Sequence, residues 1–263
     1  MEPLLERMIG WFSRLVLVFL YVPIVALIVY SFNASEVSYR YPGVSGRWYV
    51  ELFHDARLLE TLRTSVVVGV LASLIATALG FLSAFALVRF RVRGRAFFLG
   101  AILVPLIVPE IVLGVALLTV FSSAGIATGM LTLVLGHVVV VLPLATLVLL
   151  GAISGLDPSL SEAATDLGAS AWVTFRRVLF PLLRPAVLAA FLLSFTTSFS
   201  NIVISTFTSG VGTTTLPLRI YSMLRTGLTP EMNALGTLLV LFTLLVIALV
   251  GVQQMRRILA NTP

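Results

Sequence analysis

The sequence contains no cysteine, which excludes disulfides, thiolate metal ligands and a cysteine nucleophile. It also contains no lysine, so all 17 basic residues are arginines. A Walker A loop needs a lysine to reach the β- and γ-phosphates of a nucleotide, and a Schiff base needs a lysine amine. We therefore expect no cofactor in this chain, and we expect any ATP and Mg²⁺ to be bound by a partner protein.

Charged residues are scarce, at 11% of the chain, whereas 59% of the residues are hydrophobic. A typical soluble domain has about 25% charged residues, so this chain has too few to cover a globule of its size. Six stretches are apolar over about 20 residues, the length that crosses a bilayer as a helix. The sequence predicts an all-α, polytopic membrane protein that forms one domain over residues 1–263, with six transmembrane helices at residues 12–32, 65–88, 97–121, 131–153, 185–207 and 234–252.

Arginine placement predicts the orientation. The loop between the second and third predicted spans contains Arg89, Arg91, Arg93 and Arg95 and no acidic residue. Such a cluster marks a cytoplasmic loop, so both termini are expected in the cytoplasm. The first span is expected to be retained, because residues 31–35 make a poor signal-peptidase site. The net charge of +6 then reflects arginines at the ends of spans, and no nucleic-acid partner is expected.

The predicted cytoplasmic loop at residues 154–184 carries two short helices. Asp157 and Pro158 form a helix-start signal, and Gly168 is a suitable stop after a run of small residues. Residues 170–180 form a second helical stretch, which Pro181 follows. An alanine face allows close approach of another backbone and suits docking into a groove. The alternative is a surface helix in the lipid headgroups, and the residues alone leave both open.

The loop reads Glu162-Ala163-Ala164, three residues, Gly168, nine residues, Val178, one residue, Phe180-Pro181. This order and spacing resemble the signature of the ABC-importer permeases, which is E-A-A, three residues, G, nine residues, I, one residue, L-P. Here Val178 and Phe180 replace the isoleucine and leucine. The resemblance implies a coupling helix that sits in a cleft of a cytoplasmic ATPase. It assigns this coupling role to Glu162, Ala163, Ala164, Asp166, Gly168, Arg176 and Pro181.

Two further stretches, residues 105–114 and 215–235, resemble the spermidine/putrescine permeases of the C type. The resemblance implies a type I ABC-importer permease in the bacterial inner membrane that carries polyamines or a related small amine. It also implies a heterodimer with a homologous permease, two ATPase subunits and an extracytoplasmic solute-binding protein. The alternatives are an ABC permease for another small solute, an ion-gradient secondary transporter, or a membrane scaffold without transport.

Polar residues inside predicted spans are candidates for a substrate path, because charges at bilayer depth usually face a cavity or a partner. Glu110 lies in the third span beside Pro109, which removes a backbone donor and can kink the helix. Glu110 is a candidate counter-charge for a cation or, alternatively, a structural hydrogen-bond partner. The fifth span carries a polar stripe at helical spacing, which lines an aqueous path or bonds another helix. The stripe comprises Ser194, Thr197, Ser198, Asn201 and Ser205.

The sequence departs from the polyamine permeases in this stripe. Those permeases usually show S-L-D-D, whereas residues 198–201 here read Ser-Phe-Ser-Asn. His137 is the lone intramembrane histidine, for which we expect a hydrogen bond between helices. With 2 histidines and no clustered carboxylates, no metal site is expected. No catalytic residue is expected either, and the chain is predicted not to be an enzyme.

Residues 216–225 read as a short amphipathic helix outside the membrane. The resemblance places Leu216, Arg219 and Tyr221 at an outer gate that meets the solute-binding protein. The alternative is a helix that rests on the bilayer surface.

Overall fold

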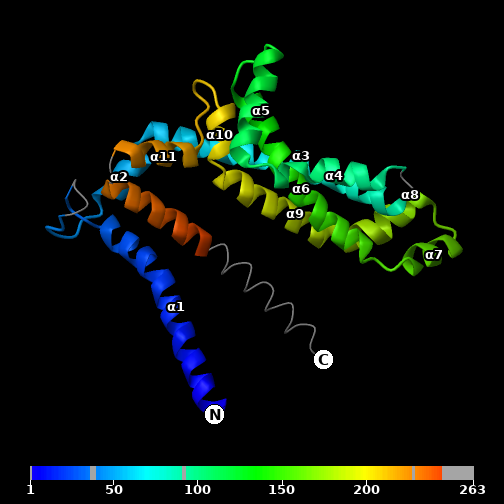
Figure 1. The fold of residues 1–263 in the computed structure, drawn as a ribbon, viewed down its shortest axis with the longest axis horizontal. Helices are drawn as coiled ribbons and strands as arrows, with labels where there is room; N and C mark the ends of the chain where they lie inside the picture. The colour runs from blue at the N-terminus through cyan, green and yellow to red at the C-terminus, as the bar shows by residue number, and fades with distance from the viewer. Residues whose placement is uncertain (1, 36–39, 91–92, 227–228, 245–263) are drawn as a thin grey trace. The chain divides into compact units, whose positions relative to one another are not determined.

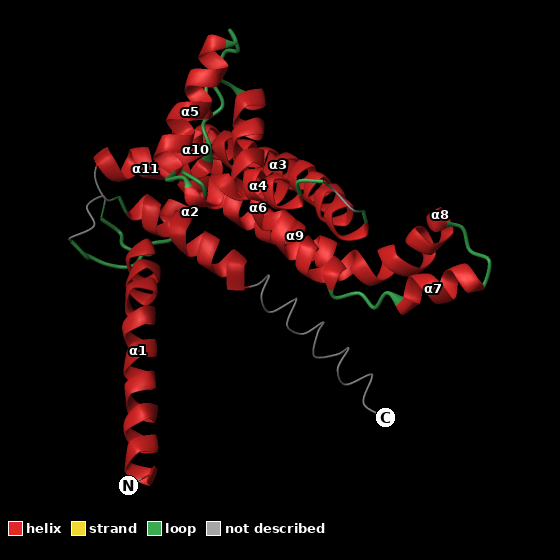
Figure 2. Cartoon of the chain, turned by 45° about the vertical axis from the view of Figure 1, so that its right-hand side comes forward, coloured by secondary structure: helices red, strands yellow, loops and turns green. Residues whose placement is uncertain are grey.

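The computed structural model describes residues 2–35, 40–90, 93–226 and 229–244, and these residues are helical apart from their connecting loops and one isolated bridge between Asn33 and Val44 (Figure 2). The predicted all-helical class is confirmed for these residues. The chain divides into two compact units. The smaller comprises residues 1–59 and 222–263, and the larger comprises residues 60–221.

The larger unit is a bundle of helices (Figure 1). Long apolar helices form its body, and a π-helical turn joins the loop helices to α9. In chain order the elements are α3 (Ala56–Arg89), α4 (Arg95–Ile107), α5 (Glu110–Ser123), α6 (Met130–Ser154), α7 (Ser159–Asp166), α8 (Ala171–Thr174), η1 (Phe175–Leu179), α9 (Phe180–Ser200), α10 (Val203–Thr208) and α11 (Leu216–Thr226).

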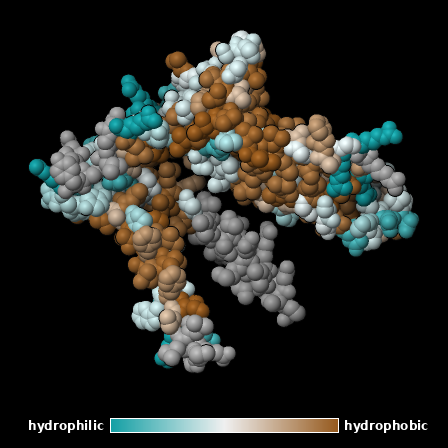
Figure 3. All heavy atoms as spheres, in the orientation of Figure 1, coloured by the Kyte–Doolittle hydropathy of each residue, from teal (hydrophilic) through white to brown (hydrophobic). Residues whose placement is uncertain are grey.

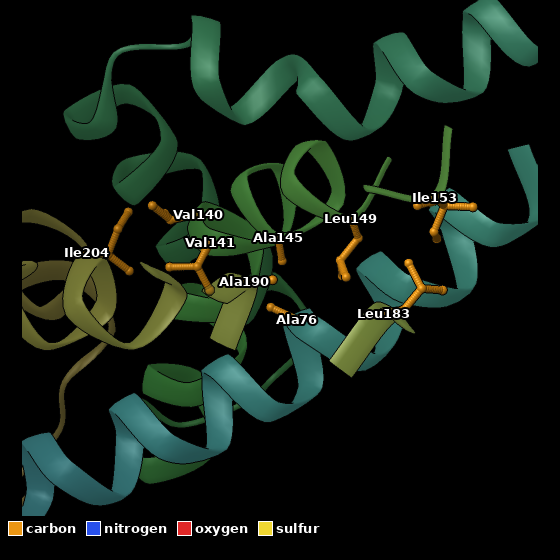
Figure 4. Close-up of a cluster of buried hydrophobic side chains, with 10 residues drawn as sticks. Ala76, Val140, Val141, Ala145, Leu149, Ile153, Leu183, Ala190 and Ile204 are labelled. Carbon is orange, nitrogen blue, oxygen red and sulfur yellow. The ribbon is translucent and has the colours of Figure 1, made fainter. Parts of the chain in front are cut away.

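Helix α6 occupies the centre of this unit and packs against α4, α9 and α10. Its sequence is apolar around the whole circumference, as expected of a helix surrounded by others. Leu133, Val141 and Leu149 are completely buried. They belong to the packed interior of this unit. Figure 4 shows one cluster of this interior, which is made of residues from α3, α6, α9 and α10.

Gly80 allows α3 and α6 to approach closely. A Cβ atom at Gly80 would lie 3.0 Å from the backbone nitrogen of Thr146, whereas a Cβ atom at Gly100 on α4 would meet nothing within 4 Å. We expect Gly80→Val to destabilise the folded permease by about 1–3 kcal/mol more than Gly100→Val, because overpacking forces the backbones apart. Thermal unfolding of the two purified variants tests this, and equal losses would contradict it.

The smaller unit contains α1 (Glu2–Ser31), α2 (Arg47–His54) and the apolar helix Pro230–Leu244. Close packing joins the first and last of these, since a Cβ atom on Gly236 would lie 2.9 Å from Leu27 Cδ1. The Trp48 indole donates to the Asn33 carbonyl at 2.7 Å and anchors α2 to the end of α1.

Apolar side chains cover large parts of the surface. On α1, Trp11, Phe12 and Phe19 are each exposed by 69% or more. Figure 3 shows hydrophobic residues along the larger unit and hydrophilic residues at the end that holds α7 and α8. Exposed apolar area of this extent marks a surface that another apolar medium covers, and helices of this length make that medium the lipid bilayer.

Four helices among the described residues are long and apolar enough to span a membrane, or five if a bent pair counts as one span. The four are Glu6–Ser31, Ala56–Arg89, Met130–Ser154 and Ala171–Ser200. They correspond to the first, second, fourth and fifth predicted spans, with longer N-terminal ends. Of the predicted sixth span, residues 234–244 lie in the helix Pro230–Leu244, and residues 245–252 lie outside the described part.

The apolar segment predicted as the third span, residues 97–121, is bent sharply at Pro109, where a kink was expected. The structure has α4 and α5, whose axes differ by 108° at a break formed by Val108 and Pro109. Proline lacks a backbone N–H, and its ring forces the preceding residue out of the helical region. Val108 accordingly adopts φ −71° and ψ 131°.

The continuous helix predicted over residues 185–207 is also interrupted. Helix α9 already begins at Phe180 and ends at Ser200, and α10 begins at Val203. Asn201 takes an extended conformation (φ −76°, ψ 117°), and its side-chain oxygen accepts a hydrogen bond from Ile204 N at 2.8 Å. An asparagine that bonds the backbone in this way favours a helix start over helix continuation, which explains the break.

Candidate functional site

The two helix breaks of the larger unit meet. Helix α10 packs against α5, and Asn201 Nδ2 donates a hydrogen bond to Glu110 Oε1 at 3.4 Å. The Asn201 amide is oriented by Ile204 N, which donates to its oxygen and leaves its NH₂ group to face the carboxylate. The structure thus brings together two predicted path residues that lie 91 positions apart in the sequence.

Glu110 is the first residue of α5, and its side chain is exposed at the surface of this chain. A carboxylate in the first helical turn is stabilised by the partial positive charge of the helix N-terminus. Asn201 behind it is only 8% exposed. The arrangement presents one fixed negative charge on an apolar surface, which suits an ammonium group as the ligand.

The remaining stripe residues lie on both sides of the break at Asn201, with Ser194, Thr197 and Ser198 on α9 and Ser205 on α10. Ser194, Ser198 and Ser205 are buried, and the latter two contact the imidazole of His137 on α6. Thr197 is half-buried and donates to the Leu193 carbonyl at 2.9 Å. The expected hydrogen bond between helices at His137 is confirmed. Ser198 and Ser205 of the polar stripe therefore serve for contact with α6.

Helix α7 contains four of the seven predicted coupling residues, namely Glu162, Ala163, Ala164 and Asp166. Glu162 and Ala163 are exposed, whereas Ala164 is buried. Gly168 follows α7 with φ +78°, a conformation that glycine adopts without a Cβ penalty. Its N–H donates to Thr165 O at 2.8 Å, and Ala169 N donates to Ala164 O at 2.9 Å. This Schellman motif ends the helix where the sequence predicted a stop.

The start of α7 is fixed by Asp157. Its carboxylate accepts a hydrogen bond from Ser159 N at 2.9 Å, and hydrogen bonds from Ser159 lower the pKa of Asp157 below its usual value. A carboxyl group whose pKa is lowered in the folded state contributes its full stabilisation above the pKa of the unfolded state. This stabilisation is lost only as the pH falls through the pKa of the folded state. The cap therefore persists at neutral pH.

Aromatic rings connect the loop to the bundle. Phe175 lies 5.5 Å from Phe85, 5.7 Å from Trp172 and 5.9 Å from Phe180 between ring centroids. It is the first residue of η1, and π-helical turns often mark functional positions. Arg176 is exposed on η1, and Pro181 lies in the first turn of α9. Sequence reasoning missed the contact with α3, because helical spacing shows only partners within one helix.

The residues predicted for an outer gate lie on α11. Leu216 is 1% exposed, and its N–H donates to Ser65 Oγ at 2.7 Å. Arg219 is half-buried and Tyr221 is exposed by 41%. The helix predicted over residues 216–225 is present. Within the described part of the chain, no group of three histidine or carboxylate side chains could hold a metal ion.

The bundle has long apolar helices, polar breaks that meet at a carboxylate, and a polar loop at one end. These features define an integral membrane protein of the transport class. A profile of the family described as "Binding-protein-dependent transport system inner membrane component" matches residues 76–258. The chain belongs to this family, so it is an inner-membrane permease component of an ABC transporter.

Two relatives illustrate the similarity. The "Spermidine/putrescine transport system permease protein PotC" of Haemophilus influenzae is 40% identical over 238 residues, which cover 90% of this chain and 93% of the relative. The "Putrescine transport system permease protein PotI" of Escherichia coli is 39% identical over 228 residues, which cover 84% of this chain and 81% of the relative. The predicted resemblance is therefore confirmed.

Solved structures agree on the fold. A bacterial ABC transporter involved in the import of the acidic polysaccharide alginate aligns with a TM-score of 0.66 at 18% identity, covering 95% of this chain and 96% of that chain. The MetNI methionine ABC transporter aligns with a TM-score of 0.61 at 18% identity, covering 81% and 99%. These similarities support the helical permease architecture.

Proposed function

We propose that the chain is the permease subunit of an ATP-driven importer for spermidine, putrescine or a related small amine. The observation that carries this proposal is the exposed carboxylate of Glu110, held at the meeting point of two broken helices and oriented by Asn201. Its chemistry matches the polyamines named for the relatives PotC and PotI. Glu110, Asn201 and Thr197 face the solute on this proposal, and Ser194, Ser198 and Ser205 support the path from behind.

The topology we propose has six spans, with α4 and α5 together forming one broken span and both termini in the cytoplasm. Residues 1–263 act as one permease domain, and residues 154–184 form its cytoplasmic coupling loop. The support is the arginine-rich segment before α4 and the alternation of spans that follows from it.

Single cysteines test this topology without background labelling, because the chain has no cysteine of its own. Ala163 and Val211 are both exposed, and the proposed topology places them on opposite sides of the membrane. In intact cells we expect a membrane-impermeant maleimide to label Val211→Cys at once and Ala163→Cys only after permeabilisation. Labelling of both from outside, or of Ala163→Cys alone, would contradict the topology.

The partners on this proposal are a homologous permease, two ATPase subunits that bind ATP and Mg²⁺, and an extracytoplasmic solute-binding protein. The exposed apolar side chains of Leu167 (88%) and Trp172 (66%) flank α7 and enlarge the surface that the ATPase would cover. Leu216, Arg219 and Tyr221 form the outer gate that meets the binding protein.

The mechanism is alternating access. ATP closes the ATPase dimer, α7 moves with its cleft, and the aromatic contacts around Phe175 pass the movement to α3 and α9. The spans then open outward and receive the solute from the binding protein. ATP hydrolysis returns them to the inward-facing state. The permease supplies a path and a coupling surface but no chemical step.

Reconstituted complexes test the function directly. We expect ATP and the loaded binding protein to drive uptake of spermidine or putrescine into proteoliposomes, and collapse of ion gradients with ionophores to leave the initial rate unchanged. Uptake that needs an ion gradient but no ATP would support a secondary transporter instead. ATP-driven uptake of a neutral solute with no uptake of amines would replace the proposed substrate and leave the importer class intact.

A further inference from the structure

His137 bridges the two sides of the break in the α9–α10 span. It lies on α6 and is 2% exposed. Its Nδ1 lies 2.7 Å from Ser198 Oγ, near the end of α9, and its Nε2 lies 3.1 Å from Ser205 Oγ on α10. One imidazole therefore connects the helix that ends at the break with the helix that begins after it.

The hydrogen bonds fix the role of each ring nitrogen. Ser205 Oγ donates its single proton to the Asn201 carbonyl at 2.9 Å, so toward His137 this hydroxyl can only accept. With Ser205 Oγ accepting, Nε2 carries the ring proton in this arrangement. In a neutral imidazole the other nitrogen is then an acceptor, and Ser198 Oγ donates to Nδ1. Both ring nitrogens of His137 are thereby satisfied.

The same bonds reach the proposed substrate site. Ser205 holds the Asn201 backbone carbonyl, and the Asn201 side chain donates to Glu110. Hydrogen bonds thus connect the buried ring to the Asn201 backbone and the Asn201 side chain to the exposed carboxylate, and the covalent structure of Asn201 joins the two. A buried polar network of this kind is stabilising only when each member is satisfied, so its loss at one end is felt at the other.

We propose that His137 is a positioning residue, which in its Nε2–H form holds the α9–α10 break so that the Asn201 amide faces Glu110. Packing of α6 does not require a histidine at this point, because its buried neighbours Val134, Val138 and Val141 fill the interior with apolar side chains. The role toward substrate rests on the proposed function of Glu110, whereas the ring geometry does not depend on it.

The first experiment reads the ring directly. The chain has 2 histidines, and the second is His54 on α2. Nitrogen-15 NMR of the full chain, labelled in its histidine rings, therefore gives two sets of signals, and His54→Gln assigns them. At pH 7 we expect protonated Nε2 and unprotonated Nδ1 for His137, with the Nδ1 signal shifted in Ser198→Ala. A protonated Nδ1, or no response to Ser198→Ala, would overturn the proposed geometry.

The second experiment measures ATP-driven spermidine uptake by the assembled complex. We expect His137→Leu to lower the maximum rate about tenfold, because it removes both imidazole hydrogen bonds. A tenfold loss corresponds to about 1.4 kcal/mol, which lies within the range of two lost hydrogen bonds. Complex yield and basal ATPase activity should stay unchanged. His137→Gln, which retains a donor and an acceptor, should recover most of the rate, and the control His54→Leu should keep it all.

A double variant separates positioning from a general structural role. If His137 acts through Asn201 and Glu110, His137→Leu combined with Glu110→Gln should lose no more uptake than Glu110→Gln alone. Independent losses that multiply would refute the positioning role. If the wild-type complex carries no amine at all, the proposed function fails, while the NMR result still decides the ring geometry.

Discussion

Reversing the charge of Glu162 with Glu162→Arg is expected to abolish ATP-driven uptake while the permease still folds and reaches the membrane. The side chain is exposed on α7, and substitutions at exposed positions usually change stability by less than about 0.5 kcal/mol. In the assembled importer the same position lies against the ATPase on our proposal. Removing one partner of a hydrogen-bonded charge pair at an interface costs about 2–5 kcal/mol of binding free energy. Each 1.4 kcal/mol corresponds to a factor of ten, so we expect coupling to the ATPase to fall more than tenfold.

The measurement compares uptake with ATPase activity stimulated by the loaded binding protein, and both should fall together. Glu6→Arg is the matched control, because Glu6 is an exposed acid on α1 that the proposed topology also places on the cytoplasmic side. It should retain both activities. If uptake and stimulated ATPase activity survive in Glu162→Arg, the coupling role of α7 is wrong.

Neutralising the path carboxylate with Glu110→Gln should lower uptake of spermidine and putrescine by about tenfold to a hundredfold. Glutamine keeps the size of the side chain and an oxygen that accepts from Asn201 Nδ2. Only the charge is lost. Hydrogen bonds to charged groups contribute about 1.5–3 kcal/mol, and each 1.4 kcal/mol corresponds to a factor of ten.

Initial uptake rates of spermidine, putrescine and a neutral control solute decide the role of Glu110. Glu51→Gln, at an exposed position on α2, serves as the matched control and should behave as the wild type. A selective loss of the two amines supports the counter-charge role. An equal loss for all three solutes would instead assign Glu110 a structural role.

Local composition accounts for most of what could be predicted. Apolar runs such as residues 131–153 form helices wherever they are placed in a bilayer, because only a helix satisfies every backbone group within the segment. The stop at Gly168 was also local, since the left-handed conformation favours glycine. The two breaks were predictable to different degrees. Pro109 indicated a kink in the third span, because proline lacks a backbone donor, but the 108° angle did not follow from the sequence. Asn201 belongs to a polar stripe at helical spacing, which gave no sign of a stop, because the stop depends on how its side chain bonds the backbone.

The sequence by itself determined that this protein lies in the membrane, lacks the lysine of an ATP site and carries the loop signature of the ABC-importer permeases, because each property depends on composition or on residues close together in the chain. Only the tertiary structure decided that Glu110 meets Asn201, that His137 joins Ser198 to Ser205, and that Phe175 contacts α3. These partners are separated by 61 or more positions. Their meeting depends on how the helices pack, which periodicity within a single helix does not encode.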